Sequence, residues 1–275
     1  KEFNSNLNSS IMGLISEIIP VFVRKSIFGY KAIVYSSLAI AFVGYFVWGH
    51  HMFTSGMSGT ARVVFSILTF LVAVPSGVKV FNWVATLYKG SINLQTPLLY
   101  ALAFIFLFMI GGFTGLVVGA LSLDVHLQDT YFVVGHFHYV MFGGTGFAFL
   151  AAIHYWFPKM FGKMYNSKRA NIGWGVLFVG FNFLYFPMLI LGIMGMPRRY
   201  YDYLPEFTTL NVVSTVGSWI TAIGLIIIIS NLVKAYRKGE AATHNIWGGI
   251  TLEWTTKSPP PLLNFDEVPE VTRGP

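Results

Sequence analysis

Long apolar runs separated by short polar loops dominate this sequence. A helix that crosses a hydrocarbon core of about 30 Å needs roughly 20 apolar residues. The runs that meet this length are Ala32–Phe53, Ala61–Tyr88, Pro97–Leu121, Thr130–Phe157, Ile172–Met194 and Leu210–Tyr236. A shorter run, Ile11–Val23, precedes them and is interpreted as the end of an incomplete seventh helix. The pattern predicts an all-α membrane protein with six transmembrane helices.

The two ends of the chain differ from this core. The segment Lys1–Ser10 is polar and is expected to be disordered, and residues 11–238 form the predicted transmembrane core. Residues 239–275 are predicted to form a tail, which contains three consecutive prolines at 259–261 and so favours an extended conformation. Because residue 1 is not methionine, we expect a processed or cut N-terminus, or the start of a fragment.

Composition supports a surface that faces lipid. Of the 275 residues, 55% are hydrophobic and only 11% are charged, whereas a soluble domain carries about 25% charged residues. The chain has no cysteine, which excludes disulfides and thiolate-bound metals. The net charge of +7 does not predict a nucleic-acid partner, because the basic residues lie in short loops between apolar runs.

These basic residues predict an orientation, because cytoplasmic loops carry an excess of Lys and Arg. One side of the predicted membrane carries eleven of them, namely Arg24, Lys25, Lys31, Lys89, Lys159, Lys163, Lys168, Arg169, Lys234, Arg237 and Lys238. The other side carries three, namely Arg62, Arg198 and Arg199. We therefore predict that the first side, with both termini, faces the cytoplasm or the mitochondrial matrix.

Four histidines near the outer side are candidate metal ligands. His50 and His51 are adjacent, so both rings can reach one copper, iron or zinc ion. His136 and His138 are two residues apart, which on an α-helix places them about 200° apart and favours two separate metals or haems. The alternatives are interfacial histidines for the first pair and hydrogen-bonded core histidines for the second.

Other polar residues of the predicted spans also require an explanation. Arg198 and Arg199 can bind carboxylates such as haem propionates, or they are an ordinary exposed pair. Lys79 is deep in its helix, one turn after Ser76 and next to the weak point made by Pro75 and Gly77. This arrangement favours a polar proton path, and the alternative is a lysine that snorkels to the membrane surface.

An outer loop and one further histidine complete the candidates. Asp124, His126, Gln128 and Asp129 can hold a hard divalent ion, or they form a solvated polar loop. His154 lies near the inner side, where we predict that it anchors the helix at the membrane interface.

Four motifs resemble a known family when taken in order. They are Trp48-Gly49-His50-His51-Met52-Phe53, Pro75-Ser76-Gly77-Val78-Lys79-Val80-Phe81-Asn82-Trp83, Asp129-Thr130-Tyr131-Phe132-Val133-Val134-Gly135-His136-Phe137-His138-Tyr139 and Gly195-Met196-Pro197-Arg198-Arg199-Tyr200. Together they resemble subunit I of the haem–copper oxidases, of the cytochrome c oxidase type. The similarity runs from about Gly13 to Asp266 and implies part of a twelve-helix core.

The resemblance implies a role for each matching residue. His50 and His51 would ligate the active-site copper, His136 the high-spin haem and His138 the low-spin haem. The remaining roles are haem-propionate binding by Arg198 and Arg199, a proton channel with Lys79 and Ser76, and a magnesium site at Asp129. At position 128 the family usually has histidine, whereas this chain has Gln128, so the magnesium site departs from the family's pattern.

The implied activity is reduction of oxygen to water with electrons from cytochrome c, coupled to proton translocation. The alternatives are a quinol oxidase of the same family and a cofactor-poor proton-relay or structural subunit. The implied partners are a separate chain with the N-terminal part of subunit I, oxidase subunits II and III, and cytochrome c or an equivalent donor. We expect a bacterial cytoplasmic membrane, with the mitochondrial inner membrane as the alternative.

Overall fold

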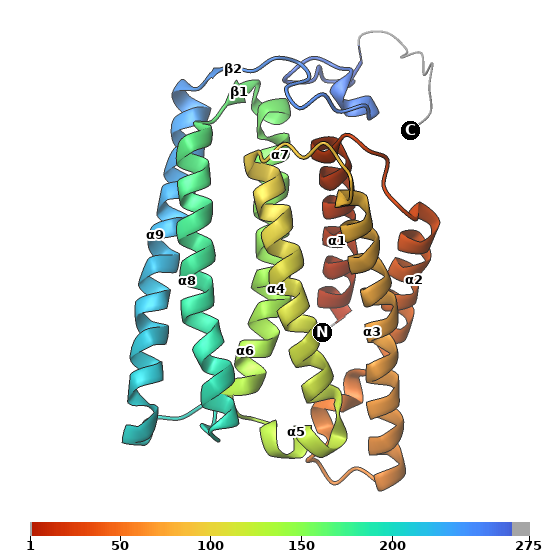
Figure 1. Cartoon of the computed structure of the whole chain (residues 1–275), viewed down its shortest axis with the longest axis vertical. Coiled ribbons are helices and arrows are strands. Elements are labelled where there is room, and N and C mark those ends of the chain that lie inside the picture. The colour runs from red at the N-terminus through yellow and green to blue at the C-terminus, as the bar shows by residue number, and fades with distance from the viewer. Residues whose placement is uncertain (1, 266–275) are drawn as a thin grey trace.

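The computed structural model describes residues 2–265, and side chains from Met12 onward. Its helices form an elongated bundle (Figure 1). The long helices and the segments that join them are α1 (Glu2–Val23), α2 (Tyr30–Phe46), η1 (Trp48–Met52), α3 (Gly59–Leu87), α4 (Thr96–Gly119), α5 (Leu121–Leu127), α6 (Tyr131–Val140), η2 (Met141–Gly146), α7 (Phe147–Phe161), α8 (Ser167–Ile193) and α9 (Thr208–Lys238). The short elements are β1 (Lys163–Met164), η3 (Pro205–Phe207), β2 (Glu240–Ala241) and η4 (Leu252–Trp254).

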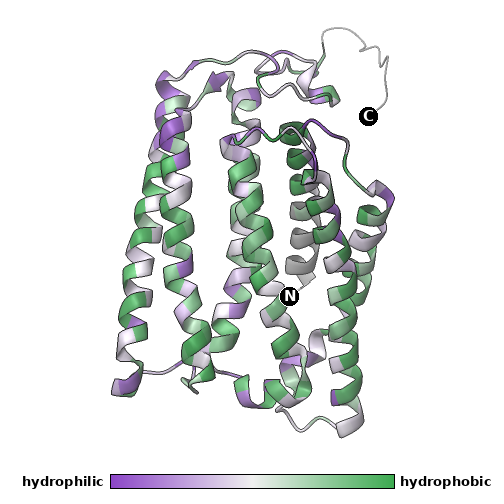
Figure 2. Cartoon of the chain, viewed as in Figure 1, coloured by the Kyte–Doolittle hydropathy of each residue, from purple (hydrophilic) through white to green (hydrophobic). Residues whose placement is uncertain are grey.

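Six of these stretches are long and apolar enough to cross a membrane, which confirms the predicted number. They are Tyr30–Met52, Gly59–Leu87, Thr96–Gly119, Tyr131–Phe161, Ser167–Ile193 and Pro205–Lys238. Hydrophobic residues cover the middle of the bundle and polar residues gather at its ends (Figure 2). The arrangement follows from the absence of water in a bilayer core, where each backbone polar group must bond within its own helix.

The two ends of the bundle carry different residues. The end at the top of Figure 1 holds β1, β2 and the described part of the C-terminal tail, and we call it the basic end because Lys163, Arg237 and Lys238 lie there. The opposite end holds η1, α5 and the start of α6, and we call it the histidine end. Helix α1 begins at mid-height of the bundle.

Three local predictions differ from the structure. Residues 2–10, expected to be disordered, continue α1, since the segment has no glycine or proline before Gly13 to end a helix. The outer loop around residues 122–129 contains the short helix α5. The first long helix ends at Phe46, and a separate 3₁₀ turn, η1, carries His50 and His51.

Small residues allow close helix packing between α8 and α9. A side-chain carbon on Gly180 would lie 2.5 Å from the backbone nitrogen of Thr221, and one on Gly224 would lie 2.7 Å from that of Leu177. Helices in lipid associate through such close contacts, because burial of apolar surface gives no advantage between them.

The N-terminal helix and the tail join the bundle at the basic end. The rings of Phe22 on α1 and Trp247 in the tail lie 5.3 Å apart. The indole of Trp247 donates to the Tyr155 carbonyl oxygen at 2.8 Å. β1 and β2 pair antiparallel, with Lys163 opposite Ala241. Together these contacts close the basic end over α1 and α7.

Candidate haem and copper ligand site

His50 and His51 converge on one point at the histidine end. Their Nε2 atoms lie 2.9 Å apart and their ring centroids 4.1 Å apart. Two imidazole nitrogens bound at about 2.0–2.1 Å to one metal, with a right angle between the bonds, would lie about 2.9 Å apart. Successive residues on a 3₁₀ turn project about 120° apart, because such a turn has three residues. The rings nevertheless converge, and the pair fits one metal ion.

His136 extends from α6 toward α4. Its Nδ1 lies 3.1 Å from the Gly111 carbonyl oxygen and 3.0 Å from the Thr114 hydroxyl. A side chain on Gly115 would lie 3.1 Å from the His136 ring, so this glycine leaves space for the imidazole. His51 is close enough to interact electrostatically with His136. The third histidine therefore belongs to the same layer as the first pair.

His138 extends from the same helix toward α8. Its ring stacks on Tyr185 with centroids 4.2 Å apart, and its Nδ1 lies 2.9 Å from the Val134 carbonyl oxygen. The contacts with two different neighbouring helices agree with the opposed directions that the spacing predicts for His136 and His138.

The hydrogen bonds of His136 and His138 identify which nitrogen of each ring carries the proton. A backbone carbonyl oxygen only accepts hydrogen bonds, so Nδ1 of both His136 and His138 carries the proton. In a neutral imidazole, Nε2 then keeps the lone pair that a metal requires. Ligating histidines commonly donate their other ring N–H to such an acceptor. The two residues therefore fit iron ligation through Nε2.

The pair Asp129 and Arg198 joins the loops of the histidine end. Arg198 donates from Nε to Asp129 Oδ1 at 2.7 Å, and its backbone N–H donates to the Asp129 carbonyl oxygen at 2.9 Å. The Arg199 guanidinium lies 4.0 Å from the same carboxylate, and its side chain is 75% exposed. Arg199 is thus the arginine that is more available to a carboxylate ligand.

The predicted magnesium site lacks a cluster of ligands in this part of the chain. Asp129 already uses Oδ1 in its bond with Arg198. Residues 2–265 contain no group of three or more His, Cys, Asp or Glu side chains placed to hold a metal. The Gln128 amide donates to the His51 carbonyl oxygen at 3.2 Å, which ties this loop to the histidine pair. His126 lies on the exposed side of α5.

Asp124 is buried, although the sequence suggested a solvated loop. The side chain is 2% exposed, and its Oδ2 has no hydrogen-bond partner within residues 2–265. Burial, and secondarily the charge of Asp129, raises the pKa of Asp124 to about 6. A clue to this burial in the sequence is that Asp124 is flanked by the apolar residues Leu123 and Val125.

Lys79 is buried within the bundle and does not snorkel. Only 1% of its surface is exposed, and Nζ lies 3.2 Å from the sulfur of Met12 on α1. A thioether is a weak acceptor, so the amine has a poor partner there. Ser76 donates to the Val72 carbonyl oxygen of its own helix at 2.9 Å. A second contact between α1 and α3 joins Ser16 to Trp83, whose indole donates to the Ser16 hydroxyl at 2.9 Å.

The prediction of an interfacial His154 is wrong. The residue is fully buried at 0% exposure, and its ring centroid lies 5.0 Å from those of both Tyr100 and Tyr165. Its Nδ1 lies 2.7 Å from the Leu150 carbonyl oxygen. Sequence position alone placed it near the membrane surface, but the segment after α7 folds back and covers it.

Comparison with known proteins identifies the family of this chain. Residues 8–220 match the family described as cytochrome c and quinol oxidase polypeptide I. The chain is 48% identical over 265 residues to cytochrome c oxidase subunit 1 of Thermostichus vulcanus, covering 96% of this chain and 48% of that protein. It is 50% identical over 263 residues to the protein of the same name from Synechocystis sp., with the same two shares covered.

The fold agrees with this match. A cryo-EM structure of a haem–copper terminal oxidase dimer aligns with a TM-score of 0.76 at 22% identity, over 84% of this chain and 46% of that one. The chain spans about half the length of the curated relatives it matches. With its residues 8–220 matched, the chain belongs to the cytochrome c and quinol oxidase polypeptide I family.

Proposed function

We propose that this chain is the C-terminal part of the catalytic core of a respiratory terminal oxidase, which reduces oxygen to water with electrons from cytochrome c and translocates protons. The relatives named above are cytochrome c oxidase subunits, which supports cytochrome c over quinol as the donor. The observation that carries the proposal is the 2.9 Å separation of the His50 and His51 Nε2 atoms. That distance matches two ligands of one copper ion.

The residues of the histidine end would hold three redox centres. His50 and His51 would bind copper, His136 the iron of a high-spin haem and His138 the iron of a low-spin haem. When bound, these groups supply oxygen binding and electron transfer. The protein residues hold the imidazoles in place: Gly111 and Val134 accept from Nδ1 of His136 and His138, and so direct both Nε2 atoms outward from α6.

Charged residues near the four histidines would bind haem propionates and magnesium, and Lys79 would carry protons. Arg199, together with Arg198, would bind haem propionates through its guanidinium. Asp129 would contribute to a magnesium site only with ligands from outside residues 2–265, because no ligand cluster forms within them. Protons would move past Lys79 and Ser76 from the basic end. Lys79 is buried and its Nζ contacts a weak acceptor, the sulfur of Met12, so the amine is available to accept and release a proton.

The proposal requires a second chain. Copper would have two ligands here and the low-spin haem one, so further ligands must come from the complementary N-terminal part of subunit I. Oxidase subunits II and III are the further partners that the proposal includes. The exposed apolar side chains of α2, among them Phe42 and Tyr45 at 69% and 63% exposure, are available to lipid or to such a chain.

The membrane orientation is part of this proposal. The basic end would face the cytoplasm or matrix, because it carries the excess of Lys and Arg. An introduced Lys89→Cys should react with a membrane-impermeant thiol reagent only from that side, and the natural chain has no cysteine to interfere. Reaction only from the outside would reverse the orientation. A bacterial cytoplasmic membrane is our proposed location, since the relatives named above come from bacteria.

The deciding experiment is purification of the tagged chain from its native membrane. We expect a copurifying chain with at least five further spans, a Soret band, reduced-minus-oxidised α-peaks and copper. The chain expressed alone should be unstable and should bind copper weakly. A stable lone chain with full haem and copper content would contradict the need for a second chain, and a native complex without haem would contradict the oxidase assignment.

A further inference from the structure

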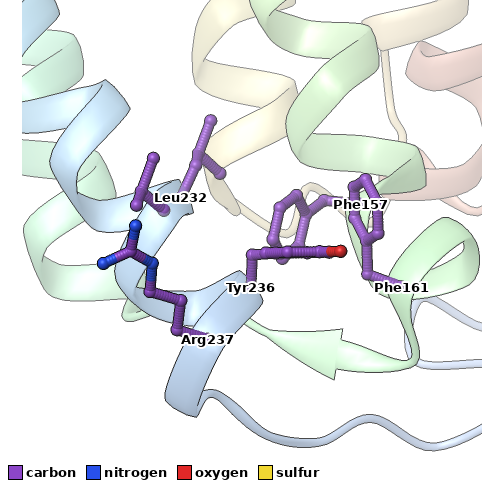
Figure 3. Close-up of a pocket in the computed structure, with 6 residues that line it drawn as sticks. Phe157, Phe161, Leu232, Tyr236 and Arg237 are labelled. Atoms are coloured by element: carbon purple, nitrogen blue, oxygen red, sulfur yellow. The ribbon is translucent and has the colours of Figure 1, made fainter.

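A groove opens between α7 and α9 at the basic end (Figure 3). Its volume is about 290 Å³. The residues that line it are Phe157, Phe161, Leu232, Val233, Tyr236 and Arg237. Five of the six are apolar or aromatic, and the guanidinium of Arg237 lies at one edge. This site shares no residue with the proposed haem and copper ligands.

The walls of the groove lie in two membrane spans. Phe161 and Tyr236 meet edge to face with ring centroids 5.2 Å apart, and Phe157 lies 4.8 Å from Phe161. Phe157 is buried at 4% exposure, whereas Phe161, Val233 and Tyr236 stay partly open at 40%, 44% and 57% exposure. The groove residues lie near the ends of two candidate membrane spans, Tyr131–Phe161 and Pro205–Lys238. At that depth the groove would face the layer where lipid chains meet their headgroups.

Positive charge gathers at the headgroup edge of the groove. Arg237 lines the groove and is exposed. Lys163 donates to the Tyr236 carbonyl oxygen at 2.7 Å and its ammonium lies 5.9 Å from the Tyr236 ring. These contacts hold a second positive charge beside the aromatic wall.

No carboxylate neutralises this cluster within the described residues. The ion pairs of residues 2–265 are those of Arg198 and Arg199 with Asp129, at the other end of the bundle. Glu240 follows the cluster in sequence, but it pairs through its backbone with Met164 in the β1–β2 ladder. The edge of the groove therefore keeps its positive charge where a headgroup would lie.

We propose that this groove binds one anionic phospholipid. An acyl chain would lie against Phe157, Phe161 and Val233, and the phosphate would accept hydrogen bonds from the Arg237 guanidinium, whose planar fork matches phosphate oxygens. Juxtamembrane basic clusters attract anionic lipids over zwitterionic ones. Charge complementarity thus selects the occupant: an apolar helix from another subunit would fill the walls but leave Arg237 and Lys163 without a counter-charge.

The test uses the complete oxidase purified with this chain, stripped of lipid in detergent. Phosphatidylglycerol or phosphatidylcholine is added back and bound lipid is counted by native mass spectrometry. We expect one tightly held phosphatidylglycerol and no equivalent phosphatidylcholine. Arg237→Gln should weaken phosphatidylglycerol retention about fivefold, the effect of one basic residue near an anionic surface. Val233→Trp, which fills the groove from an exposed position, should remove it.

The matched control is Arg24→Gln, which removes an exposed arginine from the basic end next to α1 rather than α9. It should leave retention unchanged. Equal loss in the Arg24 and Arg237 variants would show general surface attraction and overturn the site. Equal retention of both lipids would overturn the anionic selectivity. A photocrosslinker at Val233 that joins a protein subunit instead of lipid would assign the groove to that subunit and also overturn the proposal.

Discussion

The two halves of one membrane span, α6 and α7, each anchor one histidine but surround it differently. His136 on α6 and His154 on α7 each direct Nδ1 to a backbone carbonyl oxygen, at 3.1 and 2.7 Å. His136 is half-buried and lies beside Gly115, which has no side chain. His154 is fully buried between the rings of Tyr100 and Tyr165. An anchored Nδ1 therefore does not by itself identify a metal ligand.

The buried lysines show the same contrast. Lys159 on α7 donates to the carbonyl oxygens of His244 and Thr256 at 2.8 and 2.7 Å, and it lies 5.2 Å from the Trp254 ring. Among the described residues, the contact of the Lys79 ammonium on α3 is with the sulfur of Met12. A lysine with good acceptors is suited to hold a tail in place, whereas one with a poor acceptor can more readily change its protonation. The following predictions test these contrasts in the assembled oxidase.

The largest effect is expected for His136→Ala. It should abolish oxygen consumption and remove the carbon-monoxide-sensitive haem band, because the ring would be the axial ligand of that iron. His154→Ala should leave both haem signals in place, since tyrosine rings enclose its imidazole. Difference spectra with and without carbon monoxide measure this. If His154→Ala lost the carbon-monoxide-sensitive haem band and His136→Ala kept it, the proposed ligand would be His154 rather than His136.

His138→Ala should also stop turnover but with a different spectral signature. The low-spin haem signal should disappear while the carbon-monoxide-sensitive signal stays, because the two rings face different helices, α8 and α4. Optical and electron paramagnetic resonance spectra distinguish the two. If the His136 and His138 variants lost the same signal and kept the other, α6 would not carry two separate haem ligands.

Lys79→Met should slow steady-state turnover by at least about a hundredfold, the lower range for loss of a positioned proton-transfer group. Haem spectra should remain nearly normal, because a methionine of similar length can occupy the same buried space. Stopped-flow reduction of the oxidised enzyme shows whether proton delivery is the slow step. Unchanged turnover would leave Lys79 with a packing role only.

Lys159→Met should lower stability rather than catalysis. Removing an ammonium that serves two buried carbonyl oxygens costs about 2 kcal/mol of unfolding free energy. Limited proteolysis should then cut the tail near Lys257 faster, while haem spectra and turnover persist. Lys168→Met, at an exposed position of the same end, is the control and should change neither property. A loss of haem in the Lys159 variant would show that the tail also supports the ligand layer.

The smallest effect concerns pH and Asp124. Its pKa is raised to about 6 from its ordinary value of 3.8, so the folded protein binds the proton more tightly than the unfolded chain. The contribution of Asp124 is therefore present below pH 4 and declines as pH rises to about 6. Asp124→Asn should become relatively more stable than the parent protein across that range. A stability difference that did not vary with pH would show that Asp124 does not titrate there.

Much of the ligand layer followed from spacing. His136 and His138 were expected on opposite sides of one helix, and their contacts with α4 and α8 agree. The convergence of His50 and His51 could also be anticipated, although the 3₁₀ turn that achieves it could not. Local periodicity fixes directions around one helix, but the place where a helix ends depends on neighbours such as Phe65, which packs against Gly49.

The sequence by itself determined the membrane spans and which residues belong to each span. In hydrocarbon every backbone group must bond locally, so apolar length alone predicts the helices. Only the tertiary structure decided the partners of the buried polar groups: Lys159 with Thr256, 97 residues later, and Arg198 with Asp129, 69 residues earlier. Such contacts depend on how distant segments pack, which composition and spacing do not specify. They enclose His154, leave Lys79 beside a sulfur atom, and bring the Nε2 atoms of His50 and His51 to 2.9 Å from each other.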